Sequence, residues 1–545
     1  MTITKIFLTL IIALITITAK AQVAITIPAE YEKNDKLILV WPYLSGVDSI
    51  IGEITGIAKQ VVNVEIIYNP DSTQFDTTQI RSFLSNMGIN NENVSFIPAF
   101  SNTYWLRQYS PITGYGVFID SLVQYLGNPG FSSYNRPADD SIPVQLANFW
   151  NMDFAEYNLE FESTNVQYDG LRNLFVGDHI IEQNIPMDEV EISFALNSYY
   201  STGEVIFIPS LDQSGGGNFH SIDMYMKLLD SETILVASIP DTLPDYAAIE
   251  DIVFELSSIS SYYGSNYKII RILSPPNDNG NYPIIPEDEM RTYTNSLILN
   301  NTVIVPSYGL PEFDFAAYNI YEKYMPGYNI YMVDARLLTP NYGSIHTITK
   351  EIPQSNFLRI LHEKVTGPQE FISDFHINCL VASGNQVEEM WLYYKLNNDT
   401  SYTKTTIHLV CPQHFGTIAG LQTTDTVHYY IEAISSSTTT TYPLSAPEGN
   451  FTFWFDIVNI DETYVNTYDF ELVPNPSNGK FAIIRQNENS EIRIKIFNSV
   501  GQLVFVTQAY TGEIINTGNK LDKGYYTVIV GHNNNISKLK MVILN

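Results

Sequence analysis

Apolar runs of strand length alternate with helix-like segments over the first two thirds of the chain, from about residue 23 to 360. Helical periodicity is clearest at four apolar positions spaced i, i+3, i+4 and i+7: Ile249, Ile252, Val253 and Leu256. A second helix-like segment runs from about 314 to 325 and stops at Pro326-Gly327. The strand-like runs lie at 37–40, 64–68, 205–209, 233–237, 303–306 and 330–333. This alternation predicts an α/β body built of local strand–helix units.

The pattern changes between about residues 374 and 456, where helical periodicity disappears and serine and threonine become frequent. Short alternating strands lie at 391–396, 405–410 and 427–431, separated by turn residues. Strands of this size and spacing predict a small β-sandwich. The chain's two cysteines, Cys379 and Cys411, both fall here. They are expected to form one structural disulfide bridge or to stay as two buried thiols.

The last 80 or so residues form a third region, which begins with the turn-rich stretch 474–479. Apolar strand candidates follow at 481–484 and 492–497, and the chain ends in the lysine-containing apolar stretch 538–544. This pattern predicts a compact β-domain with no candidate catalytic residues.

The first 21 residues read as a secretory signal peptide. Lys5 gives a positively charged start, residues 6–18 are apolar, and Ala19-Lys20-Ala21 is a small-x-small cleavage signal. No later stretch reaches the roughly 18 apolar residues that a spanning helix needs, so no membrane span is expected.

The net charge of the chain argues against one class of partner. The chain carries 59 acidic against 28 basic residues, a formal net charge of -31. Binding to nucleic acid is dominated by lysine and arginine contacts to phosphate, so this balance argues against such a partner.

Three spaced motifs of the third region, at 473–479, 496–501 and 521–526, resemble the type IX secretion C-terminal sorting domain. The resemblance implies a partner, the type IX secretion machinery of a Bacteroidetes-type cell, and a secreted or cell-surface location. The region before it looks like an Ig-like module. The predicted domains are therefore a signal peptide at 1–21, the α/β body at 22–360, an Ig-like β-sandwich at 366–457 and the sorting domain at 467–545.

Four segments of the α/β body concentrate glycine, aromatic and ionisable residues, at 28–42, 104–111, 215–223 and 341–347. In this order they resemble the agmatine deiminase and bacterial Porphyromonas-type peptidylarginine deiminase family. The stretches 223–236, 293–300 and 345–353 follow the same family. The resemblance implies a pseudo-fivefold α/β propeller, the fold of guanidine-modifying enzymes.

The family's chemistry, as the resemblance implies it, needs neither metal nor organic cofactor. Two carboxylates hold the planar guanidinium through charge-assisted bonds. A cysteine thiolate attacks its central carbon, and a histidine acts first as general acid and then activates water. An arginine-type small molecule or peptide would be the ligand.

Several of these positions differ in this chain. Gln108 stands where the first carboxylate is expected, and an amide cannot form that ion pair. Asp223 matches the second half of a His-x-Asp pair, but His220 lies one residue too early, which in an extended strand would turn it to the opposite face. Thr347 stands at the nucleophilic cysteine, and a threonine hydroxyl needs a strong adjacent base.

Three further residues match the family pattern and are expected to line the substrate site: Asn295, Trp105 and Arg107. Each also has a structural alternative. Trp105 would be a core or pocket-wall residue, Arg107 would tie loops together, and Asn295 would satisfy backbone groups. For Thr347 the structural alternative is a packed threonine at a strand end.

The sequence leaves three functional hypotheses. The first is a secreted pseudoenzyme of the deiminase family. The second is an active deiminase that converts arginine, arginyl peptides or agmatine to ureido products and ammonia, which would require His220 and Thr347 to converge on one pocket. The third is a surface adhesin that acts through its Ig-like module.

Overall fold

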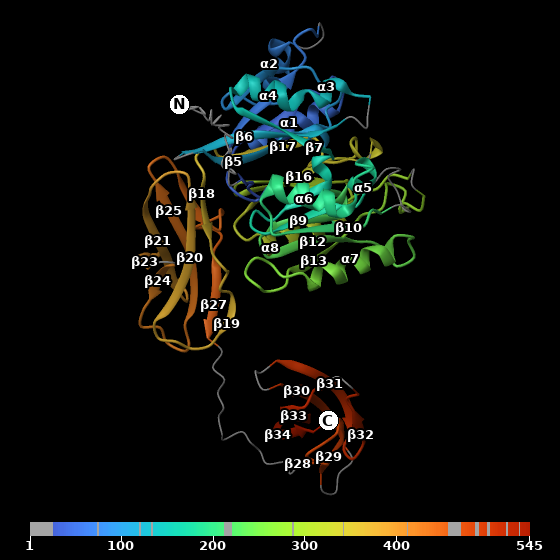
Figure 1. Cartoon of the computed structure of the whole chain (residues 1–545), viewed down its shortest axis with the longest axis vertical. Helices are drawn as coiled ribbons and strands as arrows, with labels where there is room; N and C mark the ends of the chain where they lie inside the picture. Colours follow the sequence, from blue (N-terminus) through green and yellow to red (C-terminus); the bar gives the residue numbers. More distant parts are fainter. Residues whose placement is uncertain are drawn as a thin grey trace, which may run out of the picture. The chain divides into compact units, whose positions relative to one another are not determined.

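The computed structural model describes residues 25–72, 76–118, 121–131, 135–211, 221–285, 288–341, 343–410, 413–455, 470–485, 490–498, 502–518, 521–532 and 535–544. The chain divides into two compact units, Met1–Phe455 and Asp456–Asn545. The first unit contains an α/β body, here residues 25–353, followed by a β body, here residues 358–455 (Figure 1). In the described part of the chain, no helix is long and apolar enough to cross a membrane.

The α/β body contains five small sheets. In spatial order, the first is β17 (Thr349–Pro353), β2 (Asn34–Val40), β3 (Asn63–Tyr68) and β4 (Val94–Pro98). The second is β1 (Ile25–Thr26), β5 (Ile112–Phe118), β6 (Ser121–Gly130) and β7 (Asp153–Glu160). The third is β10 (Glu204–Ile208), β9 (Asn173–Gly177) and β8 (Val166–Tyr168). The fourth is β11 (Met226–Asp230), β12 (Thr233–Ser238) and β13 (Lys268–Leu273). The fifth is β14 (Leu297–Leu299), β15 (Thr302–Ser307) and β16 (Asn329–Asp334).

Each sheet mixes antiparallel and parallel neighbours, and helices connect the parallel ones. This follows from geometry, because parallel strands need a crossover connection. The helices of the α/β body are α1 (Val47–Ala58), α2 (Thr77–Asn86), α3 (Pro137–Asp140), α4 (Ile142–Trp150), α5 (His179–Gln183), α6 (Glu189–Tyr200), α7 (Tyr246–Ser258) and α8 (Pro311–Tyr324). The predicted α/β class is therefore confirmed, and each predicted strand run falls within or overlaps one of these strands.

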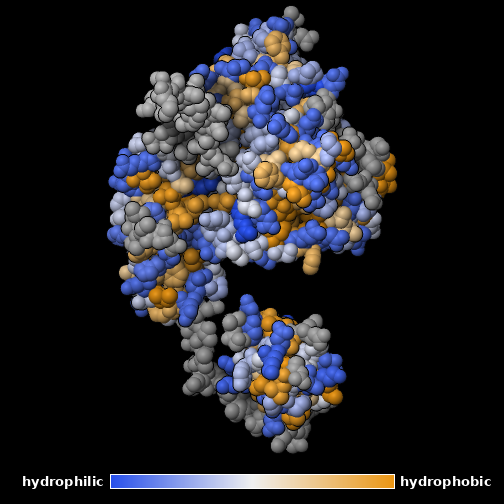
Figure 2. Space-filling model, viewed as in Figure 1, coloured by the Kyte–Doolittle hydropathy of each residue, from blue (hydrophilic) through white to orange (hydrophobic). Residues whose placement is uncertain are grey.

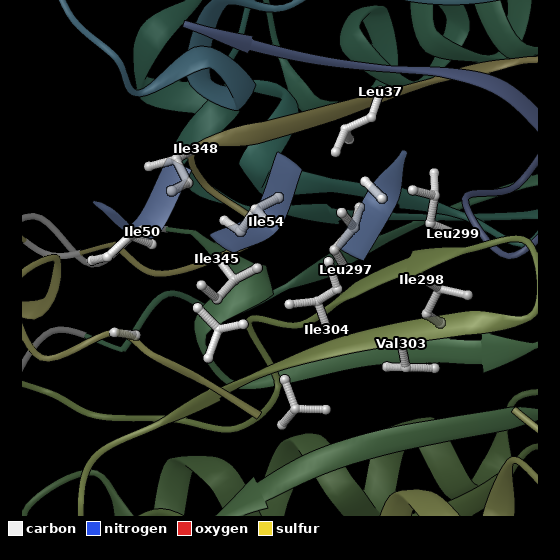
Figure 3. Packing of buried hydrophobic residues seen from close by; sticks show 14 of the residues in the cluster. Leu37, Ile50, Ile54, Leu297, Ile298, Leu299, Val303, Ile304, Ile345 and Ile348 are labelled. Carbon is white, nitrogen blue, oxygen red and sulfur yellow. The ribbon is translucent and has the colours of Figure 1, made fainter. Parts of the chain in front are cut away.

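The strand β17 joins the end of the α/β body to its beginning, because it pairs antiparallel with β2. The turn just before it, at 345–348, is anchored in the largest hydrophobic core, where Ile345 and Ile348 are fully buried (Figure 3). Leu297, Ile304 and Ile54 belong to the same core. The two residues between these isoleucines, His346 and Thr347, are thereby held in fixed positions.

The β body has two sheets that share one hydrophobic core. The first sheet is β18 (Leu358–Leu361), β20 (Phe375–Ser383), β24 (Gln413–Ile418) and β23 (His408–Val410). The second is β19 (Gly367–Gln369), β27 (Phe451–Phe455), β25 (Thr426–Ser435), β21 (Val387–Leu396) and β22 (Thr403–Thr406), with β26 (Thr439–Tyr442) also paired to β25. Cys379 is a free thiol in this core, and burial raises its pKa to about 12. Cys411 lies outside the described residues.

The second unit is all β in its described residues. One sheet is β28 (Phe470–Val473), β29 (Lys480–Arg485) and β32 (Ile514–Asn516). The other is β31 (Leu503–Tyr510), β30 (Glu491–Phe497), β33 (Gly524–His532) and β34 (Asn535–Ile543). Apolar residues from both sheets pack into one core, which agrees with the compact β-domain predicted from the sequence.

Candidate functional site

Thr347 is hydrogen-bonded to Asn295, and this uncharged pair is here called the brace. Its hydroxyl lies 3.2 Å from Nδ2 and 3.3 Å from Oδ1 of Asn295, and both residues are buried. Asn295 Oδ1 also accepts from the backbone N–H of His346 at 2.9 Å and of Thr347 at 3.3 Å. Asn295 therefore satisfies backbone groups, as its structural alternative predicted. Thr347 lies in a turn directly before β17 rather than in the strand.

His346, the neighbour of Thr347, is held between two carboxylates. Its Nδ1 lies 2.8 Å from Oδ2 of Asp223, and its Nε2 lies 2.8 Å from Oε2 of Glu30. The side chain is only 2% exposed. Both ring nitrogens are therefore engaged by carboxylates, and neither is left for Thr347.

Glu30 is the second anchor of this network. Its Oε1 accepts from Nζ of Lys227 at 2.5 Å and from the backbone N–H of Ile298 at 3.0 Å. Burial raises the pKa of Glu30, but the contacts with Lys227 and His346 lower it by more. The pKa therefore lies well below its usual value. Burial also lowers the pKa of Lys227, against the opposing effect of Glu30.

Arg107 joins the turn at 345–348 to β17. Its Nε donates to the carbonyls of His346 and Thr349, each at 2.9 Å, and its guanidinium forms a buried ion pair with Glu351. Lys350 Nζ lies 3.1 Å from the same carboxylate. Burial raises the pKa of Glu351, but Arg107 and Lys350 outweigh it and bring the pKa to about 2. Arg107 thus ties loops together, which is its predicted structural alternative.

Asp223 comes from the short 3-10 helix η3 (Ile222–Met224), where its backbone carbonyl accepts from the hydroxyl of Thr294 at 3.1 Å. Its Oδ2 faces His346, while its buried Oδ1 has no hydrogen-bond partner within the described ranges. Residues Ile222–Met224 thus form a helical turn and not an extended strand. His220 itself lies outside the described residues.

Gln108 and Trp105 lie on either side of the start of η1 (Leu106–Tyr109) and have different surroundings. Gln108 Oε1 accepts from Nη2 of Arg136 at 2.9 Å. Trp105 is half-buried and lies against Gly343, where an added Cβ would come within 2.4 Å of the indole and 3.1 Å of Thr347 Cγ2. Trp105 and Thr347 therefore flank the same glycine, and only a residue without a side chain fits between them.

The structure brings together five of the residues predicted for the site: Thr347, Asn295, Trp105, Arg107 and, through His346, Asp223. A small cavity of about 80 Å³ adjoins them, and Glu30, Arg107, His346 and Glu351 are among its lining residues. In the described residues, no group of three or more His, Cys, Asp or Glu side chains is arranged to hold a metal ion.

Sequence reasoning missed four charged residues of the site: His346, Glu30, Lys227 and Glu351. All four lie in stretches named above: Glu30 in 28–42, Lys227 in 223–236, His346 in 341–347 and Glu351 in 345–353. A signal was available, because charged residues inside otherwise apolar strands are rarely buried unless they are paired. Lys227 in β11 and Glu351 in β17 are such cases.

Comparison with known proteins agrees with this fold and identifies the family. Residues 26–353 match the Porphyromonas-type peptidyl-arginine deiminase family, and the chain belongs to that family. Residues 471–545 match the secretion system C-terminal sorting domain. This domain indicates passage through the type IX secretion machinery and a secreted or cell-surface location.

Individual relatives are distant, but each of the three described here aligns over most of its own length. A Legionella pneumophila protein named "Putative agmatine deiminase" is 22% identical over 359 residues, which are 62% of this chain and 98% of that protein. Among solved structures, the agmatine deiminase of Enterococcus faecalis superimposes with a TM-score of 0.52 at 16% identity, covering 61% of this chain and 96% of that one. An agmatine deiminase of C. jejuni gives 0.50 at 19% identity, with 61% and 97% covered. These structures share the mixed α/β fold of this chain.

Proposed function

We propose that this chain is a secreted member of the deiminase family that does not hydrolyse guanidino groups. The observation that carries the proposal is the environment of Thr347. Its hydroxyl contacts the amide of Asn295, while the adjacent His346 is engaged by carboxylates on both nitrogens. An alcohol becomes a nucleophile only beside an available base, and no described base bonds to this hydroxyl.

The distribution of cysteine supports the same conclusion. The family's chemistry uses a thiolate, and the chain's two cysteines, Cys379 and Cys411, both follow the region 26–353 that matches the family. Gln108 further weakens the expected binding of a guanidinium, because its Oε1 is an uncharged acceptor that already accepts a hydrogen bond from Arg136. Both the nucleophile and one anion of the family pattern are thus replaced by neutral groups.

The retained part of the site favours binding without turnover. Asp223 Oδ1 is buried and unpartnered within the described ranges, and such an atom costs free energy unless a ligand or water satisfies it. An arginine-type cation is the ligand that we propose for it. We also propose that the five sheets form the pseudo-fivefold propeller, with an Ig-like sandwich at 366–457 and a signal peptide at 1–21.

The test is release of ammonia and formation of a ureido product by the full chain, offered arginine, agmatine and a peptide with a C-terminal arginine. We expect no turnover from the native chain or from Thr347→Cys, because His346 remains between its two carboxylates. Turnover by the native chain that Asp223→Asn abolishes would overturn the proposal. Calorimetric titration with agmatine tests the binding step separately, since binding should be lost in Asp223→Asn.

A further inference from the structure

The α/β body and the β body are docked through specific contacts rather than joined by a free linker. Ser445 Oγ donates to the carbonyl of Pro326 at 2.9 Å, and Lys33 Nζ donates to the carbonyl of Thr439 at 2.5 Å. The backbones meet at two glycines, where an added Cβ on Gly327 would lie 2.0 Å from the backbone nitrogen of Gly449. The close approach therefore depends on the absence of a side chain at this point.

At this docking lies a cavity of about 780 Å³ that is lined by residues of both bodies. Its size lies within the range of small-molecule sites. Fourteen of its forty lining residues carry a hydroxyl, from six tyrosines and eight serines or threonines. Such a lining can both donate and accept hydrogen bonds while it offers rings for apolar contact. Figures 1 and 2 show the two bodies side by side.

Two basic residues of the cavity interior are paired with carboxylates. Arg359 Nε lies 2.7 Å from Glu32, and Lys364 Nζ lies 2.6 Å from Asp230. All four residues line the cavity. Two further acids line the interior: Asp169, which accepts from the hydroxyl of Tyr267 at 2.7 Å, and Glu232, which lies 3.6 Å from Lys364. The interior therefore offers carboxylate and hydroxyl oxygens, which suit the hydroxyl groups of a sugar.

The exposed part of the lining is different. Lys268 and Lys323 both direct their ammonium groups toward the ring of Tyr324, at 4.8 and 5.0 Å from its centroid. Both lysines are exposed, and no carboxylate of a described residue forms an ion pair with either. In a chain with a net charge of -31, two uncompensated cations beside one ring give a local site for an anionic group.

We propose that this cavity binds an acidic oligosaccharide. Its hydroxyl groups and ring faces would occupy the tyrosine- and hydroxyl-rich interior, and one carboxylate would lie at Lys268 and Lys323. The inference does not rest on the proposed function, because the cavity shares no residue with the Thr347–Asn295 brace.

Titration calorimetry with the full chain tests the ligand class, using trigalacturonic acid, the neutral galactose trisaccharide and tri-aspartate as probes. We expect trigalacturonic acid to bind at least tenfold more tightly than the other two. Lys268→Gln/Lys323→Gln should remove that preference and leave neutral-sugar binding unchanged. Lys404→Gln is the matched control, because Lys404 is an exposed lysine 3.9 Å from the ring centroid of Trp391 and outside the cavity.

The walls of the cavity can be tested independently of its charges. Gly327→Ala should separate the two bodies and weaken trigalacturonic acid binding at least tenfold. Gly420→Ala is its control, because Gly420 has a similar positive φ of +74° against +78° but no atom within 4 Å of an added Cβ. Absence of binding, equal binding of tri-aspartate, or equal effects of the two glycine variants would each overturn the proposal.

Discussion

His346 and Thr347 are neighbours in the chain, yet their surroundings are opposite in kind. His346 belongs to a buried charged network. In it, His346 contacts the carboxylates of Glu30 and Asp223, and Lys227 pairs with Glu30. Thr347 belongs to a neutral brace with Asn295. The charged network spans strands and loops far apart in sequence, so it holds the α/β body together. The brace lies where the family resemblance expects chemistry, and both of its side chains are uncharged.

The largest effect should come from removing one partner of a buried ion pair. Arg107→Met leaves the carboxylate of Glu351 buried without its main partner, and breaking such pairs costs roughly 3–5 kcal/mol of unfolding free energy. Tryptophan fluorescence during urea unfolding reports this, because all five tryptophans precede residue 456. The double variant Arg107→Met/Glu351→Met should be less destabilised than the single one. If it is not, the guanidinium acts through packing and the charged network is not what holds the body together.

Acid should weaken the same network. The pKa of Glu351 is about 2 in the folded chain against an ordinary value of 4.5, so the folded state binds fewer protons than the unfolded state. Its stabilisation is complete above pH 4.5 and is lost as the pH falls toward 2, a change of about 3 kcal/mol. Glu30 acts in the same direction. Glu351→Gln should make the unfolding free energy less dependent on pH between 4.5 and 2. An unchanged dependence would assign the acid sensitivity to other carboxylates.

Much of the fold could be predicted from the sequence, because the spacing of apolar residues indicates the local secondary structure. The predicted helix at Ile249 and Leu256 lies within α7, and both residues are buried. The charged network was harder to predict, because Glu30 and His346 are 316 residues apart and no local pattern shows that they meet. The helical turn Ile222–Met224 was not predicted either, because three residues are too few to show a periodicity.

A smaller loss should follow from removing the brace. Asn295→Ala leaves the backbone N–H groups of His346 and Thr347 buried without their acceptor, which costs about 1–3 kcal/mol. The measurement is again urea unfolding followed by tryptophan fluorescence. Asn301→Ala is the comparison, because no hydrogen bond to the side chain of this asparagine is found in the described ranges, and it should change stability by less than about 0.5 kcal/mol. A loss as large as that of Arg107→Met would erase the distinction between the two environments.

The smallest effect should come from Thr347 itself. Thr347→Val keeps the shape of the side chain and removes one hydroxyl, whose bonds to Asn295 at 3.2 and 3.3 Å are long, so the expected cost is about 1 kcal/mol. Thr347→Ser is the converse variant: it keeps the hydroxyl and removes the methyl group, Cγ2, which lies beside Gly343. Neither variant should alter agmatine binding, because the unpartnered oxygen belongs to Asp223. A threonine that acted as a nucleophile would behave differently: turnover would survive in Thr347→Ser and vanish in Thr347→Val, and the hydroxyl would then have a chemical role that its neutral surroundings do not indicate.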